Sequence, residues 1–211
     1  SKKTVSRVIN GASGLTREML EKVEQAIAEL GYVPNPQARA LALGRNFAVV
    51  LLHDNPNAQT VQNFERGILD AIRDSELALM VRPVDRRSPT MLEDVEAFLR
   101  QQRPIAAIIL PPISERDEIG ALCRSMGVGF VRVGSAALDD NDHSVTSTDR
   151  IAVTEACRLL IAVGHRRIGF VRGPQGFRSA AERELGFHAA MEAAGLVVPP
   201  EYCAQGDYRF E

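Results

Sequence analysis

The sequence predicts an α/β protein with a doubly wound parallel sheet, preceded by a small all-α head. Two observations support this fold class. The first 46 residues contain helical patterns without an apolar run of strand type, whereas residues 47–211 alternate between short apolar runs and amphipathic stretches. Strand–helix alternation at this spacing is typical of right-handed βαβ units that build a parallel sheet with helices on both faces.

Three short helical segments are expected in the head, at residues 4–10, 16–30 and 37–43. Thr16 is suited to cap the second helix, and Gly31 is a natural residue to end it. The apolar residues of this helix recur at spacings of three and four, which predicts one buried stripe formed by Met19, Val23, Ala26, Ile27 and Leu30.

Five apolar runs in the remainder predict strands that are buried on both faces of a parallel sheet, at residues 47–53, 77–83, 105–111, 128–133 and 167–173. Amphipathic stretches between them predict helices at about 60–74, 90–102, 115–126, 149–163 and 179–195. In doubly wound folds, ligands bind beyond the carboxyl ends of the strands. We therefore expect the binding residues in the loops that follow the strands.

Charge is distributed unevenly along the chain. Residues 1–46 carry a net charge of +3, whereas the remainder carries −5. A basic head on an acidic body permits contact between the head and DNA phosphates, and ordinary surface variation is the alternative explanation.

The cysteines and the apolar segments indicate the compartment. Cys123, Cys157 and Cys203 are far apart and form no CxxC pair, which argues against a disulfide framework or a cysteine zinc site. The sequence contains no run of about 18 apolar residues, so we expect no membrane span, and the first residues do not resemble a signal peptide. These features predict a cytoplasmic protein.

No motif in the sequence indicates catalysis. The phosphate loop GxxxxGK[ST], a GxGxxG after the first strand, GxSxG and HExxH do not occur, and the four histidines are scattered. We therefore predict no catalytic residue, metal site or cofactor. Two alternatives stay open, namely a small α/β enzyme with an unrecognised constellation in the same crevice and a sugar-binding protein without a regulatory role.

The stretch TVSRVING, followed by REMLEKVEQAIAELGYVPNPQARAL, resembles the DNA-binding head of the LacI/GalR family. The resemblance implies a helix-turn-helix unit whose TVSRV helix lies in the major groove of operator DNA. Lys2, Lys3 and Arg7 would then contact bases or phosphates, supported by Thr4, Ser6 and Asn10. From the residues alone, a plain polar helix is the alternative. Residues 1–34 would form a partial head, because no segment of this sequence matches the first of the three helices in the family's head.

Residues 35–46 resemble the hinge helix and linker of the same family. The resemblance implies that this helix folds when two subunits meet on the minor groove, with Asn35, Ala38 and Arg39 at the DNA. Leu41 would wedge between base pairs and kink the duplex. The alternative for Leu41 is a core contact at the domain junction.

Residues 47–211 resemble the effector domain of this family, which is similar in fold to periplasmic sugar-binding proteins. The first lobe would span about 47–148, and the second would begin at about 149 and be incomplete at residue 211. The resemblance places Asp149 and Arg183 in the ligand cleft. A carboxylate and a guanidinium suit a polyhydroxylated ligand. Asp149 could instead cap a helix, and Arg183 could pair with Glu182 or Glu184.

The loop after the first strand is a second candidate for effector binding. Asp54, Asn55 and Asn57 can all form hydrogen bonds to hydroxyl groups, but the same residue types also build turns. Many relatives carry an aromatic residue near this loop, and this loop has none. Together, the resemblance implies a transcription regulator, a repressor, whose affinity for operator DNA is controlled by a small-molecule effector, a sugar. It further implies a homodimer, with a tetramer as the alternative.

Overall fold

The computed structural model describes residues 2–9, 13–32, 46–134 and 143–208, which form two compact units, residues 1–46 and 47–211. In the smaller unit the described helices are α1 (Lys2–Ile9) and α2 (Arg17–Leu30). The expected third helix at 37–43 lies outside the described residues. Thr16 caps α2 as predicted, because its side chain accepts a hydrogen bond from the backbone N–H of Met19, and Gly31 ends the helix in the left-handed conformation with φ 57°.

The predicted apolar stripe of α2 is only partly covered. No residue of α2 is buried, and Met19 and Leu30 are 46% and 79% exposed. The described part of this unit consists of two short helices, which do not provide enough apolar surface to enclose the stripe. The prediction of a buried stripe was therefore wrong in degree, although the apolar positions Val23 and Ile27 are half-buried.

The larger unit confirms the predicted α/β class. Its first sheet has the strand order β2-β1-β3-β4-β5, and the register is parallel between β1 and β2, β3 and β4, and β4 and β5. The strands are β1 (Asn46–His53), β2 (Ala78–Pro83), β3 (Pro104–Ile109), β4 (Gly129–Gly134) and β5 (Ser144–Thr146). The intervening helices are α4 (Ala58–Ile72), α5 (Met91–Gln102), the 3₁₀ turn η1 (Ile113–Glu115) and α6 (Asp117–Ser125). We call residues 47–148 the first lobe.

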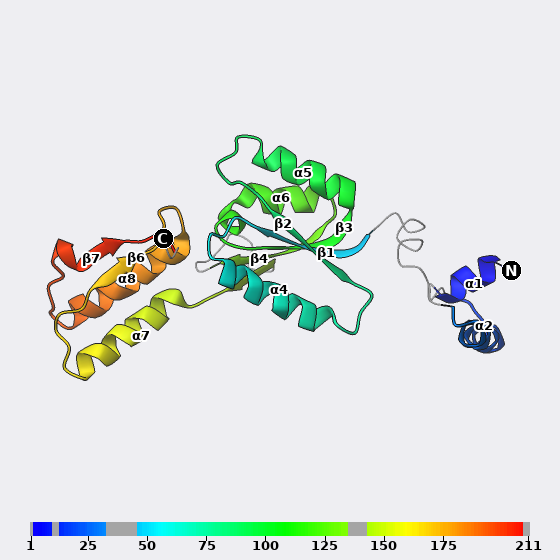
Figure 1. The fold of residues 1–211 in the computed structure, drawn as a ribbon, viewed down its shortest axis with the longest axis horizontal. Coiled ribbons are helices and arrows are strands. Elements are labelled where there is room, and N and C mark those ends of the chain that lie inside the picture. Colours follow the sequence, from blue (N-terminus) through cyan, green and yellow to red (C-terminus); the bar gives the residue numbers. More distant parts are fainter. Residues whose placement is uncertain (1, 10–12, 33–45, 135–142, 209–211) are drawn as a thin grey trace. The chain divides into compact units, whose positions relative to one another are not determined.

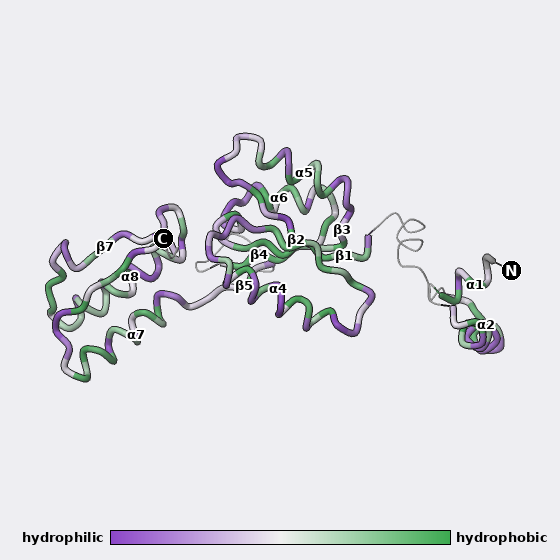
Figure 2. Tube along the Cα trace, in the orientation of Figure 1, coloured by the Kyte–Doolittle hydropathy of each residue, from purple (hydrophilic) through white to green (hydrophobic). Residues whose placement is uncertain are grey.

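Helices cover both faces of this sheet, α4 on one and α5 with α6 on the other (Figure 1). Alternate residues of β1 point to the two sides. Val50 and Leu52 pack in the cluster of α5 and α6, which includes Val95, whereas Leu51 packs with Ile68 of α4. In Figure 2, β1 and β3 are largely green, the colour of hydrophobic residues, as expected for strands whose two faces are both covered by helices.

One expectation about the sheet was wrong. Strand β2 is an edge strand with a single hydrogen-bonded neighbour, and most of its residues are exposed, Val81 by 42%. An apolar run therefore does not distinguish an edge strand from a central one, because the burial of a strand depends on its neighbours and not on its own residues. β5 was not predicted, because it has only three residues and its pairing with β4 defines it.

The second lobe, residues 149–208, is built on two packed helices, α7 (Asp149–Ala162) and α8 (Arg178–Ala193). Two parallel strands, β6 (Phe170–Arg172) and β7 (Cys203–Gln205), complete it, together with the 3₁₀ turn η3 (Pro200–Tyr202). Its core contains Cys157, Phe187 and Met191. The expected strand 167–173 is shorter than predicted, and β7 was not predicted.

The helices α7 and α8 approach closely at a glycine. A Cβ atom on Gly186 would lie 2.4 Å from the backbone carbonyl oxygen of Arg150. The hydroxyl of Thr154 donates to the Gly186 carbonyl at 3.1 Å, and the Arg150 guanidinium forms two hydrogen bonds to Glu182, at 2.7 and 2.9 Å. Glycine is therefore the residue that permits this helix contact.

Candidate effector site

A pocket of about 310 Å³ lies where the carboxyl ends of the first-lobe strands meet the starts of α7 and α8. Four of the five predicted effector residues line it, namely Asn55, Asn57, Asp149 and Arg183. We call this cavity the Asp149 pocket. Its volume is at the small end of the range of roughly 300–1,000 Å³ that is typical of small-molecule sites. Its position agrees with the rule that ligands of doubly wound folds bind beyond the strand ends.

Asp149 and Arg183 form an ion pair inside this pocket. The distance between Asp149 Oδ2 and Arg183 Nη2 is 3.3 Å, and the two side chains are 16% and 42% exposed. Oδ2 is shielded from solvent and accepts no geometrically acceptable hydrogen bond from the described residues. The pair therefore leaves acceptor capacity on the carboxylate and donors on the guanidinium, as a hydroxylated ligand requires.

The alternative roles for these two residues do not agree with the structure. Thr148, and not Asp149, occupies the N-cap position of α7, so Asp149 lies in the first helical turn. There its charge interacts favourably with the helix dipole.

The glutamates beside Arg183 have other partners. Glu182 binds Arg150 and Glu184 binds Arg172, both at 2.7 Å, so neither of these ion pairs includes Arg183. Arg183 instead donates from Nη1 to the hydroxyl of Tyr208 at 3.2 Å.

The amides of the loop after β1 hold the loop in shape. Asn55 Oδ1 accepts from the backbone N–H of Asn57 at 2.9 Å, and Asn55 Nδ2 donates to the carbonyl of Pro111 at 3.4 Å. Asn57 Oδ1 accepts from the N–H of Thr60 at 3.1 Å and thereby caps α4. Both asparagines thus have the structural role that the sequence left open, and both also line the Asp149 pocket.

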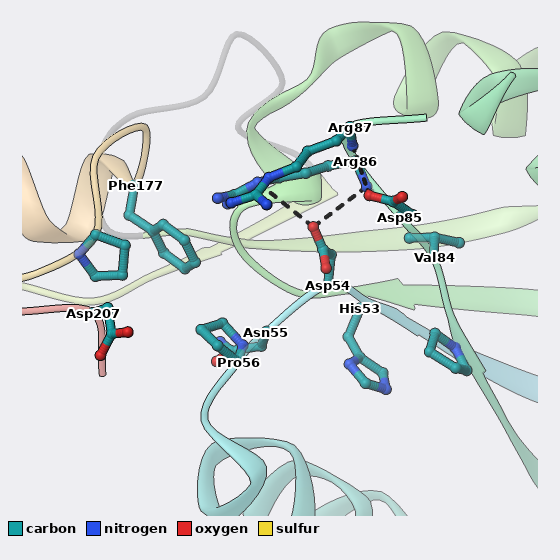
Figure 3. Close-up of a pocket in the computed structure, with 12 residues that line it drawn as sticks. His53, Asp54, Asn55, Pro56, Val84, Asp85, Arg86, Arg87, Phe177 and Asp207 are labelled. Carbon is teal, nitrogen blue, oxygen red and sulfur yellow. Dashed lines mark hydrogen bonds and ion pairs between the residues drawn. The ribbon is translucent and has the colours of Figure 1, made fainter. Parts of the chain in front are cut away.

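Asp54 does not line the Asp149 pocket. It lies in an adjoining cavity of about 460 Å³, shown in Figure 3, which we call the Arg86 cleft. Asp54 Oδ2 lies 3.5 Å from Arg86 Nε and also accepts from the backbone N–H of Arg86 at 3.3 Å. The two cavities share Asn55 and Phe177 as lining residues. Of the predicted effector residues, Asp54 is therefore the one separated from the others.

The loop after β1 contains no aromatic residue, and the aromatic side chains of the Asp149 pocket come from other elements. Phe64 of α4, Phe177 before α8 and Tyr208 after β7 line the pocket. Phe177 and Tyr208 pack edge to face, with ring centroids 6.0 Å apart at 89°. Aromatic walls with a few convergent polar groups are typical of small-molecule sites.

Sequence spacing did not reveal these aromatic residues, because tertiary packing brings them together. Gly173 lies close to the Tyr208 ring, since a Cβ atom on Gly173 would lie 2.2 Å from the Tyr208 hydroxyl. Tyr208 itself has a positive φ of 62°, which is uncommon for a residue other than glycine. The backbone at Tyr208 is thus held in a sparsely populated conformation beside the pocket.

Burial shifts the pKa of two groups near these cavities. Desolvation lowers the pKa of His53, partly offset by the charges of Glu65 and Asp54. Desolvation raises the pKa of Glu115, partly offset by a hydrogen bond from the Arg178 backbone and by the charges of Arg178 and Arg86.

Cys123 of α6 is fully buried in the core of the first lobe. Burial raises the pKa of the Cys123 thiol to about 11, which leaves it a poor nucleophile at neutral pH. Within the described ranges, histidine, cysteine and acidic residues form no group of three that could hold a metal ion.

The predicted DNA-contacting residues are only partly visible in the structure. Thr4 is half-buried on α1, whereas Ser6 and Arg7 are exposed on it, and Arg7 Nη2 donates to the carbonyl of Ser13 at 2.9 Å. Lys2 and Lys3 belong to α1. The other predicted contacts, Asn10, Asn35, Ala38, Arg39 and Leu41, lie outside the described residues. Among the helices that are described, none is long and apolar enough to cross a membrane.

Two protein families match the chain. Residues 1–35 match the family described as bacterial regulatory proteins of the lacI family, and residues 61–207 match periplasmic binding proteins and the sugar binding domain of the LacI family. The second match alone spans more than half of the sequence. The chain therefore belongs to the LacI family of bacterial regulators.

Individual relatives agree with this family. The transcriptional regulator CelR of Thermobifida fusca is 30% identical over 99% of this chain and 62% of its own length. The ribose operon repressor of Escherichia coli K12 is 28% identical over 100% of this chain and 63% of its own length.

A solved structure is also similar. The lac repressor dimer bound to operator and the anti-inducer ONPF has a TM-score of 0.73 at 26% identity, covering 99% of this chain and 62% of that one. The chain thus spans a little over three fifths of the length of these relatives.

Proposed function

We propose that this protein is a transcription regulator, a repressor, whose affinity for operator DNA is controlled by a sugar bound in the Asp149 pocket. The observation that supports this most directly is the Asp149–Arg183 ion pair in a polar and aromatic pocket between two lobes. A regulator of this kind acts in the cytoplasm and carries out binding, not chemistry.

The sugar assignment follows from the donors and acceptors of the pocket. A carboxylate accepts hydrogen bonds from hydroxyl groups, and a guanidinium donates several in a fixed geometry. Phe177 and Tyr208 add an apolar wall for the C–H face of a sugar ring. Two relatives are the ribose operon repressor and the lactose operon repressor, and a solved structure of CelR is a complex with cellobiose. These names support a saccharide as the effector.

The DNA assignment rests on the head. The exposed Ser6 and Arg7 of α1, with Lys2 and Lys3 earlier on the same helix, provide the short polar and long cationic side chains of a recognition helix. Residues 35–46 would form the hinge helix and linker, with the helix at the minor groove and Leu41 as the wedge between base pairs. A homodimer places two heads on a palindromic operator.

Sugar binding would control DNA binding through a shift of populations. A sugar that binds better to one arrangement of the two lobes favours that arrangement by its difference in affinity. The lobe movement then biases the hinge helices toward or away from the conformation that binds the operator. No covalent step is required.

Direct titration tests the sugar site. We would measure the binding of ribose, glucose, lactose and cellobiose by calorimetry for the natural protein and for Asp149→Asn and Arg183→Gln. Each variant removes a charged hydrogen-bond partner, worth about 1.5–3 kcal/mol, which corresponds to a loss of affinity of roughly 10- to 150-fold. Glu155→Gln and Arg158→Gln are matched controls, because both residues are exposed on α7 and neither lines the pocket.

DNA binding tests the second half of the proposal. Operator sites selected from randomised palindromic DNA would be titrated at several salt concentrations, with and without the bound sugar. We expect sequence-specific binding that changes with sugar, and a loss of that change in Asp149→Asn. Sugar binding that survives in both pocket variants would refute the site, whereas binding that ignores DNA sequence and sugar would refute the regulatory function.

A further inference from the structure

Helix α8 begins without a side-chain cap of its own. Its N-cap residue is Phe177, whose side chain cannot accept a hydrogen bond. The backbone carbonyl of Phe177 accepts hydrogen bonds from the N–H groups of Ala180 and Ala181. The first N–H groups of a helix have no partner inside the helix and need an external acceptor. The N–H groups of Arg178 and Ser179 lie outside these bonds, and that of Arg178 is bound by a residue of another element.

Glu115 of the first lobe provides that acceptor. Its Oε2 accepts from the backbone N–H of Arg178 at 3.2 Å, across a sequence separation of 63 residues. A carboxylate at this position also interacts favourably with the helix dipole. The second oxygen, Oε1, is buried and has no hydrogen-bond partner among the described residues. The carboxyl group is thus desolvated at the contact between the lobes.

The element that carries Glu115 is firmly held. Glu115 ends the turn η1, and the preceding residue, Ser114, is fully buried. The guanidinium of Arg132, also fully buried, donates from Nε to the Ser114 carbonyl at 2.6 Å and from Nη2 to Asp117 at 2.7 Å. These bonds fasten the turn to β4 and to the start of α6. Glu115 is therefore presented from a rigid part of the first lobe.

The start of α8 is tied to the second-lobe side of the Asp149 pocket. Ser179 and Arg183 both line the pocket, one and five residues after Arg178. A second first-lobe contact reaches the same helix start, because the Arg86 guanidinium lies 4.9 Å from the Phe177 ring centroid. Glu115 itself lines neither cavity. An influence of Glu115 on a bound ligand is therefore indirect, and its hydrogen bond to Arg178 provides a route through α8.

We propose that Glu115 is a positioning residue of the effector site, which caps α8 from the opposite lobe and thereby holds Ser179 and Arg183 in place for the ligand. This inference rests on the proposed sugar-binding function. Sugar affinity then depends on a hydrogen bond that the sugar does not touch. The same bond links the start of α8 to the separation of the lobes, since it can form only when η1 and α8 are close.

Three variants test this role by sugar titration. Glu115→Ala removes the acceptor, and a typical net hydrogen-bond contribution of about 0.5–1.5 kcal/mol corresponds to a roughly 2- to 12-fold weaker binding of the best sugar of the panel. Glu115→Gln keeps an oxygen that can accept from the Arg178 N–H and should restore affinity to within about twofold. Glu118→Ala, at an exposed residue of α6, is the matched control and should bind as the natural protein does.

Hydrogen exchange makes the inference testable without a sugar. Amide exchange of the peptide covering 177–183 should be faster in Glu115→Ala, and close to natural in Glu115→Gln and Glu118→Ala. Unchanged exchange in Glu115→Ala overturns the inference whether or not any sugar binds. Equal loss of affinity in the alanine and glutamine variants also overturns it. Faster exchange together with an absence of sugar binding in every protein would support the cap and refute the proposed function.

Discussion

The contact between α7 and α8 provides a test of the packing in the second lobe. In a Gly186→Ala variant, the new Cβ atom would lie 2.4 Å from the carbonyl oxygen of Arg150 and 3.2 Å from its carbonyl carbon and Cα. Favourable separations between such atoms are about 3.5 Å or more, so the helices must move apart by roughly 1 Å. Backbone atoms cannot rotate out of the way as a side chain could.

The energetic balance predicts a net destabilisation. Replacing glycine by alanine inside a helix gains about 1 kcal/mol. Overpacking a tight contact costs about 1–3 kcal/mol, and we expect the upper end here, because moving α8 also disturbs the packing of Phe187 and Met191. The net loss is about 2 kcal/mol, which for a unit of this size lowers the Tm by roughly 4–8 °C.

Thermal unfolding followed by circular dichroism measures this change, and the chain contains a matched control. Gly67 is an exposed glycine inside α4, and a Cβ atom there would have no neighbour within 4 Å. Gly67→Ala should therefore raise stability by about 0.5–1 kcal/mol. If Gly186→Ala unfolds at the same temperature as Gly67→Ala, or higher, then the close approach of the two helices does not exist as described.

Two further predictions concern the pocket and its surroundings. Gly173→Ala would place a Cβ atom 2.2 Å from the Tyr208 hydroxyl and 2.4 Å from Cζ, so the ring must leave the pocket wall. Calorimetry should show sugar binding weakened by roughly 2- to 12-fold, as expected for loss of the Tyr208–Arg183 hydrogen bond, and Tyr208→Ala should reproduce the loss. Natural affinity in Gly173→Ala would contradict the placement of Tyr208. Desolvation lowers the pKa of His53 from the ordinary value of 6.5, so the unfolded chain binds a proton at a pH where the folded protein does not. The stability that His53 contributes is therefore fully present above pH 6.5 and is lost as the pH falls from 6.5 through the folded pKa. Urea unfolding from pH 7.5 to 5 should show a steeper decline for the natural protein than for His53→Gln, and parallel curves would show that burial does not disfavour the charged imidazole.

Sequence patterns predicted the elements that are long and locally determined. The run 47–53 became β1 because alternate residues such as Leu51 and Leu52 are buried on opposite faces of the sheet. The burial of β2 could not be predicted, because its own residues do not reveal that only β1 pairs with it. The short strands β5 and β7 are defined by pairing with a neighbour, which no local pattern encodes.

The candidate site was predictable to a similar degree. Resemblance pointed to Asp149 and Arg183, and the structure brings them within 3.3 Å of each other. The loop pattern was less specific, because Asp54 turns toward Arg86 and away from the Asp149 pocket. Tyr208 was missed, because nothing in the sequence spacing indicates that residue 208 returns to Gly173 and Arg183.

The hydrogen bonds of Asn55 and Asn57 have a consequence for the order in which a sugar meets the two lobes. Both side-chain oxygens of these residues are already used, one to accept from the Asn57 backbone and one to cap α4. The charged groups of the Asp149 pocket, Asp149 and Arg183, both belong to the second lobe. In the proposed function, a sugar would therefore dock first on α7 and α8, and the first lobe would then meet it as a preformed wall.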